Sequence, residues 1–137
     1  MFGVDSQNFE VLFEAFAERH FVKQFRKKYR NQWTVTEKAI VALLMRVDNL
    51  IGKTTQIEVI HARCEHRIAK LDFRVVGTSE SAKCSGNRAI VYINMNTRQC
   101  RVMIVYSKND ICSPRETQKC EMMVRENLPD VWGITIK

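Results

Sequence analysis

Lys70 to Asp110 reads KLDFRVVGTSESAKCSGNRAIVYINMNTRQCRVMIVYSKND, in which three apolar runs are separated by polar segments. Within each run alternate residues differ in character, which is the period-2 pattern of a β-strand. The Asn-rich segment NMNTRQ between the second and third runs is typical of a short hairpin connection. The alternation sets one group of positions (Leu71, Phe73, Val75, Ala89, Val91, Ile93, Val102, Ile104, Tyr106) against another (Lys70, Asp72, Arg74, Arg88, Ile90, Tyr92, Arg101, Met103, Val105).

Upstream of these strands the pattern predicts one more strand and two helices. Phe9 to Phe16 alternates in part and predicts a first strand. Residues 19–33 place large apolar side chains three to four apart, as on one face of a helix. A second helix follows over 34–52, with Thr34 and Glu37 in capping-box spacing. The link between the helices is short, so we expect an antiparallel helical hairpin.

Two further segments complete the predicted order. Residues 53–69 show no clear period. After the last strand, Ser113 and Pro114 fit the start of a final helix, and residues 130–137 suggest a short strand. The order predicts an α+β fold, with an N-terminal strand and helical hairpin packed on a small, mostly antiparallel curved sheet, and a C-terminal helix. A chain of 137 residues fits a single domain.

Charge and composition narrow the classes of function. The chain has 22 Lys+Arg against 15 Asp+Glu, a net charge of +7, which favours nucleic acid, an acidic protein segment or a membrane surface as partner. No apolar run reaches the roughly 20 residues of a membrane span, and the first residues lack a signal-peptide layout. We therefore expect a soluble, cytoplasmic protein. Five cysteines without a C-x-x-C pair argue against a disulfide framework and a zinc site, so we predict no metal and no cofactor.

Cations gather on the predicted strands and on the first helix. Such cations bind phosphate and release counterions, although charged side chains are also normal on a solvated strand. Tyr106 and Tyr92 are rival candidates for positioning a nucleophile, although a strand tyrosine more often packs in the core. Cys84 lies beside Lys83, but no histidine nearby supplies a base. The strand and loop cations are Lys70, Arg74, Lys83, Arg88, Arg101 and Lys108, and the helix cations are Lys23, Arg26, Lys27 and Arg30.

The stretch from Lys70 resembles the core of the RelE/ParE superfamily of type II toxin–antitoxin toxins, especially its RelE and HigB-like branches. Those proteins carry a K-L-R-F-like strand, a small basic glycine loop, an R-V-I-Y-Y-like strand and an L-L-I-Y-x-K-N-like last strand. The upstream RHFVKQFRKKY is similar to the family's opening helix. The resemblance covers Phe9 to Asp110 and implies a toxin core over about 9–110, with a C-terminal extension over 111–137.

The resemblance implies a metal-independent, ribosome-dependent mRNA endoribonuclease, in which the 2′-OH attacks the adjacent phosphate. Arg88 would stabilise the pentacoordinate phosphate, and Tyr106 would orient or deprotonate the 2′-OH. Lys70 or Lys83 would offset charge on the leaving oxygen, and Lys108 matches the terminal cation. The implied partners are a cognate antitoxin, mRNA and the ribosomal RNA of the 70S ribosome, without a membrane.

The chain also departs from the family pattern. Asp72 stands where the family has its second basic residue, and Ser85-Gly86 replaces a pair of glycines. Two alternatives therefore stay open. One is a ParE-like toxin that inhibits gyrase without nuclease activity, and the other is a degenerate member that only binds its antitoxin.

Overall fold

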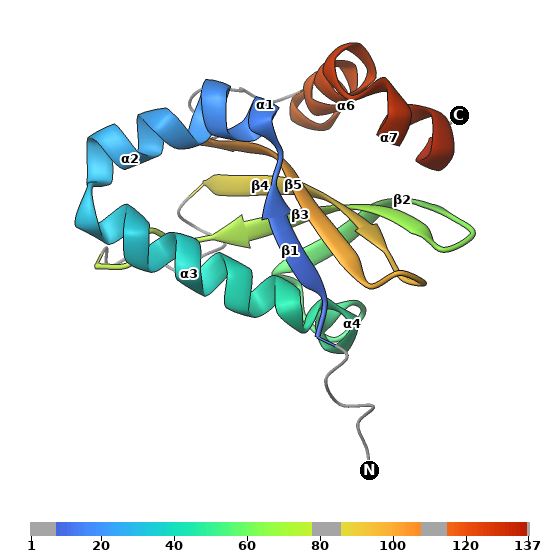
Figure 1. The fold of residues 1–137 in the computed structure, drawn as a ribbon, viewed down its shortest axis with the longest axis horizontal. Coiled ribbons are helices and arrows are strands. Elements are labelled where there is room, and N and C mark those ends of the chain that lie inside the picture. Colours follow the sequence, from blue (N-terminus) through green and yellow to red (C-terminus); the bar gives the residue numbers. More distant parts are fainter. Residues whose placement is uncertain (1–7, 78–85, 108–114, 137) are drawn as a thin grey trace.

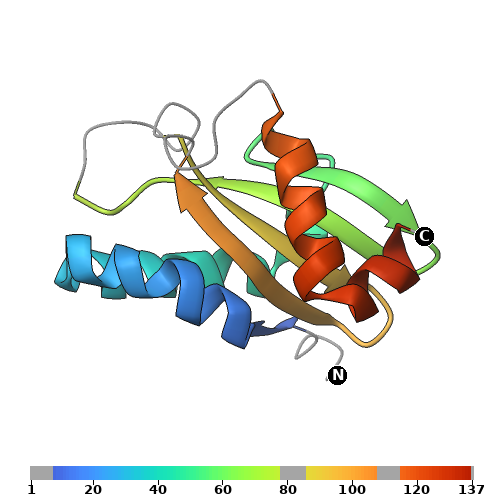
Figure 2. The same ribbon diagram turned by 90° about the horizontal axis from the view of Figure 1, so that it is seen from above.

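The computed structural model describes residues 8–77, 86–107 and 115–136, and it shows an α+β fold with helices on both faces of one sheet (Figures 1 and 2). The five strands lie in the order β1-β5-β4-β3-β2. The strands are β1 (Glu10–Phe13), β2 (Ile57–Arg63), β3 (His66–Phe73), β4 (Asn87–Asn94) and β5 (Gln99–Ser107). The helices are α1 (Ala15–Ala17), the π-helical turn η2 (Glu18–Val22), α2 (Lys23–Tyr29), α3 (Asn31–Met45), α4 (Val47–Leu50), α6 (Glu116–Asn127) and α7 (Pro129–Thr135).

The predicted fold class is confirmed, and the sheet contains one strand, β2, that was not predicted. β2 to β5 pair antiparallel in chain order, whereas β1 pairs parallel with β5. β2 lies in the segment without a clear period. Its register shifts between Val59 and His61, so its side chains do not alternate regularly between core and solvent. An edge strand with a bulge lacks the regular alternation of apolar and polar residues by which a strand is predicted from sequence.

The two N-terminal helices pack on one face of the sheet, as expected from their apolar faces. Arg30, at φ 53°, makes the sharp turn between α2 and α3. The helix then begins at Asn31, so the prediction of Thr34 as its capping residue is wrong. Thr36 instead anchors α3: its hydroxyl donates to Gln32 O at 2.7 Å and accepts from the Val76 N–H at 2.8 Å.

An aromatic cluster forms the centre of this first core. The ring of Phe25 lies 5.1 Å from that of Trp33 and 5.9 Å from that of Phe73, measured between centroids. Trp33 and Leu44 are fully buried on α3. β3 and β4 contribute their predicted alternate positions to the core beneath α2 and α3, so this part of the alternation is confirmed. These residues are Leu71, Phe73, Ala89, Val91 and Ile93.

β5 departs from the predicted alternation because it carries one extra residue. Ile90 pairs with Ile104, whereas Val91 pairs with Val102, which leaves Met103 as the extra residue of a bulge. Val102 and Val105 therefore face the first core. Ile104 and Tyr106 face the other side, so the prediction that Val102, Ile104 and Tyr106 share a face is wrong.

The opposite face of the sheet is covered by α6 and α7 (Figure 2). These helices bury Cys120, Val124, Leu128 and Val131 against the sheet. The centre of this second face is apolar, and the C-terminal helices cover it. Residues 129–135 form α7, with Pro129 at its start, and not the predicted strand. The sheet residues beneath the two helices include Ile68, Ile90, Tyr92, Met103, Ile104 and Tyr106.

The β4–β5 connection is the tight turn that the Asn-rich segment predicts. The Asn94 side-chain oxygen accepts from the N–H groups of Asn96 and Thr97, at 2.9 and 3.0 Å. Arg98, at φ 59°, completes the turn. Within the described ranges, none of the helices has the length and apolar character needed to cross a bilayer. The expected helix start at Ser113 and Pro114 lies outside the described residues.

Candidate functional site

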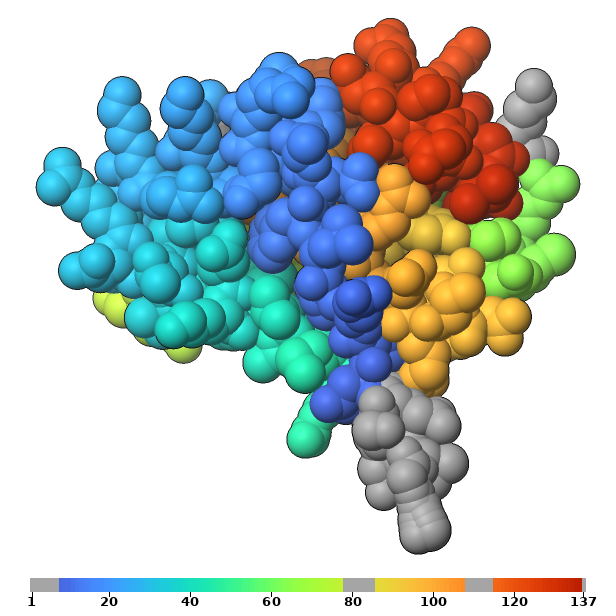
Figure 3. Space-filling view, in the orientation of Figure 1, coloured from blue at the N-terminus to red at the C-terminus, as the bar shows by residue number. Residues whose placement is uncertain are grey.

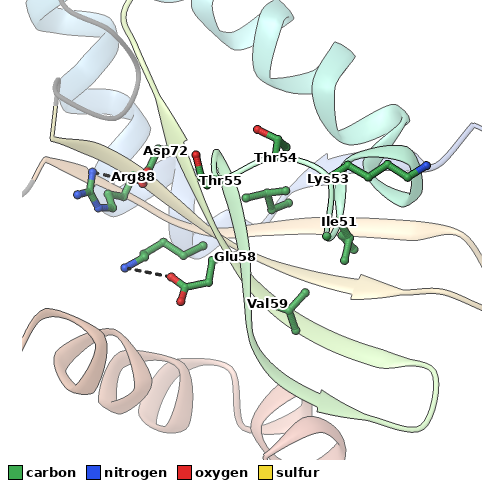
Figure 4. A pocket seen from close by; sticks show the side chains of 11 residues that line it. Ile51, Lys53, Thr54, Thr55, Glu58, Val59, Asp72 and Arg88 are labelled. Carbon is green, nitrogen blue, oxygen red and sulfur yellow. Dashed lines mark ion pairs between the residues drawn. The ribbon is translucent and has the colours of Figure 1, made fainter.

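A groove of about 920 Å³ runs along β2 and the loop before it (Figure 4). Its apolar part is formed by Ile51, Ile57 and Val59, and its charged part lies toward β3 and β4. The side chain of Lys53 extends away from Arg88 in this view. The remaining lining residues are Gly52, Thr54, Thr55, Glu58, Lys70, Asp72 and Arg88. The groove thus combines an aliphatic wall, hydroxyl groups and two converging cations.

Strand register brings the charged side chains together. Glu58 on β2 pairs with Lys70 on β3, and Asp72 on β3 pairs with Arg88 on β4. The Lys70 Nζ lies 3.8 Å from Glu58 Oε1, at a site where the glutamate is largely exposed. Such an exposed ion pair contributes little to stability, so Lys70 remains available to an incoming anion.

Arg88 is held more firmly, between two carboxylates. Its Nη1 lies 3.4 Å from Asp72 Oδ1, and its Nε lies 3.2 Å from Glu116 Oε2. The Arg88 side chain is 16% exposed, so its charge requires nearby compensation. Neither contact has hydrogen-bond geometry, and the buried Nε and Nη1 atoms make no hydrogen bond among the described residues. Arg88 is therefore charge-compensated, while its Nε and Nη1 donors have no hydrogen-bond acceptor among the described residues.

Tyr106 lies directly across the β4–β5 ladder from Arg88, beneath α6. Its hydroxyl donates to the Glu116 carboxylate. Burial, and then this hydrogen bond, raise the pKa of Tyr106 well above its ordinary value of 10. The phenol is therefore neutral and buried in this arrangement. The role of Tyr106 in orienting or deprotonating the 2′-OH stays a prediction.

Glu116 contacts two of the candidate site residues and was not predicted from the sequence. It stands in the first turn of α6 and contacts both Arg88 and Tyr106. Its only sequence signal is an acidic residue at the start of a predicted helix. Nothing in the spacing shows that this helix lies over the sheet face that carries Arg88.

The remaining predicted cations do not join the groove. Arg74 follows the end of β3 and lines a separate groove of about 390 Å³ with Thr36 and Phe73, so the expectation that it shares the Lys70 face is wrong. Arg101 donates to Glu14 at 2.6 Å and to Asp130 at 3.3 Å, and the Glu14 hydrogen bond raises its pKa further. Lys83 and Lys108 lie outside the described residues.

The basic face of the first helices lies apart from the groove. Lys23, Arg26, Lys27 and Arg30 are all exposed. α2 lies on the opposite side of the sheet from α6 (Figure 2). The structure therefore does not merge these cations with Lys70 and Arg88 into one continuous surface.

Tyr92 lies at the other end of β4 from Arg88. Its hydroxyl hydrogen-bonds to His66 Nδ1 at 2.6 Å and to Asn94 Nδ2 at 3.3 Å. Burial is the main cause that raises the Tyr92 pKa. Of the two rival tyrosines, Tyr106 is therefore the one next to the groove cations.

Two broader observations complete the description of the site. Among the described residues, no three His, Cys, Asp or Glu side chains lie close enough together to hold a metal ion. The chain matches no family model, no curated protein and no solved structure in three comparisons with known proteins.

Proposed function

We propose that this protein is a RelE-like toxin that binds mRNA through the Lys70–Arg88 groove and cleaves it without a metal. The observation that carries the proposal is the convergence of Lys70 and Arg88 on one groove. A pair of cations beside an aliphatic wall suits a single-stranded nucleic acid, because the cations take the phosphate and the wall takes the sugar and base. A ribosomal target would place the protein in the cytoplasm.

The proposed cleavage is an internal transfer of phosphate. The RNA 2′-oxygen forms a bond to the adjacent phosphorus as its proton departs, and the bond from phosphorus to the 5′-oxygen breaks. The products are a 2′,3′-cyclic phosphate and a 5′-hydroxyl, which takes up a proton. Arg88 would hold the two non-bridging oxygens, and Lys70 would offset charge on the leaving oxygen. No electron transfer or co-reactant is required.

In the observed arrangement an RNA phosphate must compete with Asp72 and Glu116 for Arg88. Tyr106 must also be freed from Glu116 before it can orient a 2′-OH. The nuclease proposal therefore requires the first turn of α6 to move away from β4. Charge repulsion between phosphate and Glu116 would favour that movement.

Mapping of mRNA 5′ ends after induced expression tests the proposal. We expect growth arrest with new 5′-hydroxyl ends for the wild type, and neither effect for Arg88→Ala. Arg63→Ala is the matched control, because Arg63 is an exposed cation at the far end of β2. Growth arrest without new ends would contradict the nuclease proposal.

A second candidate is a protein that binds its partner without cleaving RNA, either as a gyrase inhibitor or as an antitoxin-binding member. The observation in its favour is the burial of Tyr106 beneath α6, with its proton held by Glu116. DNA double-strand breaks with intact mRNA would support gyrase inhibition. Unimpaired growth together with tight antitoxin binding would support the binding-only role.

The exposed cations of α2 suit a separate contact with ribosomal RNA. Lys23, Lys27 and Arg30 have no ion-pair partner among the described residues, and Arg26 makes only a long contact of 3.5 Å with Glu18. Each phosphate contact releases counterions, so this contribution to ribosome affinity should weaken steeply with salt.

A further inference from the structure

The outer edge of β1 is a second candidate binding surface of this molecule. β1 ends the sheet, with β5 as its only neighbour among the described strands. The Glu10 N–H donates to Arg98 O and the Glu14 N–H donates to Val102 O, both at 2.9 Å. In a parallel pair, alternate residues direct both main-chain groups to the same neighbour. Glu10, Leu12 and Glu14 therefore face β5, and Val11 and Phe13 direct their main-chain groups away from it.

An apolar groove of about 520 Å³ adjoins this edge. Its walls are Val11, Leu12 and Phe13 on β1 and Val41, Ala42 and Met45 on α3. Leu12 is 41% exposed, which is high for a leucine beside a core. One end of the edge is already closed, because the Phe9 N–H donates to Met45 O at 2.9 Å. The surfaces of β1 and α3 lie side by side in the space-filling view (Figure 3).

The rim of the groove is acidic, in contrast to the chain as a whole. Glu18 and Glu37 line it against a single ammonium group, that of Lys38, whereas the whole chain has a net charge of +7. Burial and the charge of Glu18 raise the pKa of Glu37. Glu37 has no ion pair among the described residues, and Glu18 has only the exposed 3.5 Å contact with Arg26. A cation placed between the two carboxylates would relieve their repulsion.

From these observations we propose that the groove between β1 and α3 binds an extended, basic peptide segment of another protein, which adds a strand to the outer edge of β1. The main chains of Val11 and Phe13 supply the ladder hydrogen bonds. Aliphatic side chains of the peptide pack on Val41 and Ala42, and its Lys or Arg side chains pair with Glu18 and Glu37. Binding by strand addition gives affinity through the main chain and specificity through alternate side-chain pockets.

This site is independent of the proposed RNA groove. β1 and β2 lie at opposite edges of the five-stranded sheet, and the RNA groove runs along β2. A peptide on β1 touches neither Lys70 nor Arg88, so failure of one proposal does not affect the other.

Fluorescence anisotropy tests the proposal with a short labelled peptide of alternating valine and lysine. A second peptide carries glutamate in place of lysine, and a third is N-methylated at alternate backbone nitrogens. Nonspecific attraction to a chain of charge +7 favours the glutamate peptide. We expect the opposite preference, with the lysine peptide binding at least about tenfold more tightly than either control.

Matched variants locate the binding site. Ala42→Gln fills the groove and should weaken binding of the lysine peptide by about tenfold, and Glu37→Gln should weaken it by a smaller factor. Ala39→Gln is the control, because Ala39 is also exposed on α3 but lies outside this groove. Three results would overturn the proposal. They are no binding to the wild type, equal binding of the N-methylated peptide, and an undiminished affinity of Ala42→Gln for the lysine peptide. Self-association that Ala42→Gln abolishes, without peptide binding, would identify a second copy of this chain as the occupant and would also overturn it.

Discussion

Glu116 on α6 forms an ion pair with Arg88 on β4, at 3.2 Å between Oε2 and Nε. The same carboxylate accepts a hydrogen bond from the Tyr106 hydroxyl. One side chain of the C-terminal helix thus holds two residues that the sequence analysis singles out for RNA chemistry. The contact connects helix docking to the availability of Arg88.

Replacing Glu116 by glutamine should loosen this contact while keeping its shape. The amide can still accept from Tyr106, but Arg88 retains only Asp72 as a compensating charge. We expect a loss of about 1–3 kcal/mol in the free energy of unfolding, measured with urea, and tighter binding of single-stranded RNA. Glu126→Gln, at an exposed position of the same helix, should change stability by less than about 0.5 kcal/mol. Unchanged stability and RNA affinity in Glu116→Gln would show that the contact does not restrain Arg88.

The stability of the fold should fall at alkaline pH. Burial raises the pKa of Cys120 from 9.0 to about 11 and that of Cys100 from 9.0 to about 12. The pKa of Tyr106 is raised above its ordinary value of 10.0. A raised pKa means that the folded state keeps a proton that the unfolded state has already lost, so stability is full below the unfolded pKa and decreases above it. The free energy of unfolding should therefore decrease from about pH 9 and more steeply above pH 10. The pKa of Tyr92 is raised as well, so Tyr106→Phe should make the decrease above pH 10 less steep without abolishing it. An identical pH profile for this variant would contradict the assignment.

Two acidic partners of Arg101 should differ sharply in their contribution to stability. Glu14 accepts from Arg101 Nε at 2.6 Å at a mostly buried site, whereas the Asp130 side chain is 64% exposed. Glu14→Gln should cost about 1–3 kcal/mol, because a charged partner of a hydrogen-bonded Arg is lost. Asp130→Asn should cost less than about 1 kcal/mol, because its charge is screened by water. Equal effects in denaturant unfolding would refute this ranking.

The first core should respond strongly to truncation on α3. Leu44 is fully buried against the sheet, and Leu44→Ala should cost about 2–5 kcal/mol through lost burial and a residual cavity. Val35 lies on the same helix but is 51% exposed, so Val35→Ala should change the free energy of unfolding by less than about 0.5 kcal/mol. Thermal and urea unfolding would both register the difference. A comparable cost at the two positions would mean that α3 packs differently from the structure.

Much of the fold follows from sequence patterns that depend only on local spacing. The alternation of Leu71 and Phe73 places these residues in the first core as predicted, and Phe25 also lies there on a helix. Trp33 is in the same core but belongs to α3, not to the first helix on which it was predicted. The Asn94 turn likewise follows from its residue type. These features depend on residues close together in the chain. The spacing of apolar residues identifies the strands and helices, and the residue type identifies the turn.

The features that escaped prediction depend on contacts between distant segments. The bulge at Met103 changes the face of Tyr106 without any proline or glycine to mark it. Glu116 reaches Arg88 only because α6 folds back over the sheet, which its sequence does not specify. Strand phase groups Lys70, Asp72 and Arg88, but the approach of Glu58 and Glu116 to these cations is visible only in the structure.

The claim that Lys70 takes RNA phosphate in the groove is tested most directly by the salt dependence of RNA binding. Single-stranded RNA affinity should fall linearly on a log–log plot against salt for the wild type and for Lys70→Gln. Each lost phosphate contact reduces the slope by about 0.7, so the Lys70→Gln slope should be shallower by that amount, with Arg63→Gln unchanged. A Lys70→Gln slope equal to that of the wild type would contradict the account, because Lys70 would then contact no phosphate.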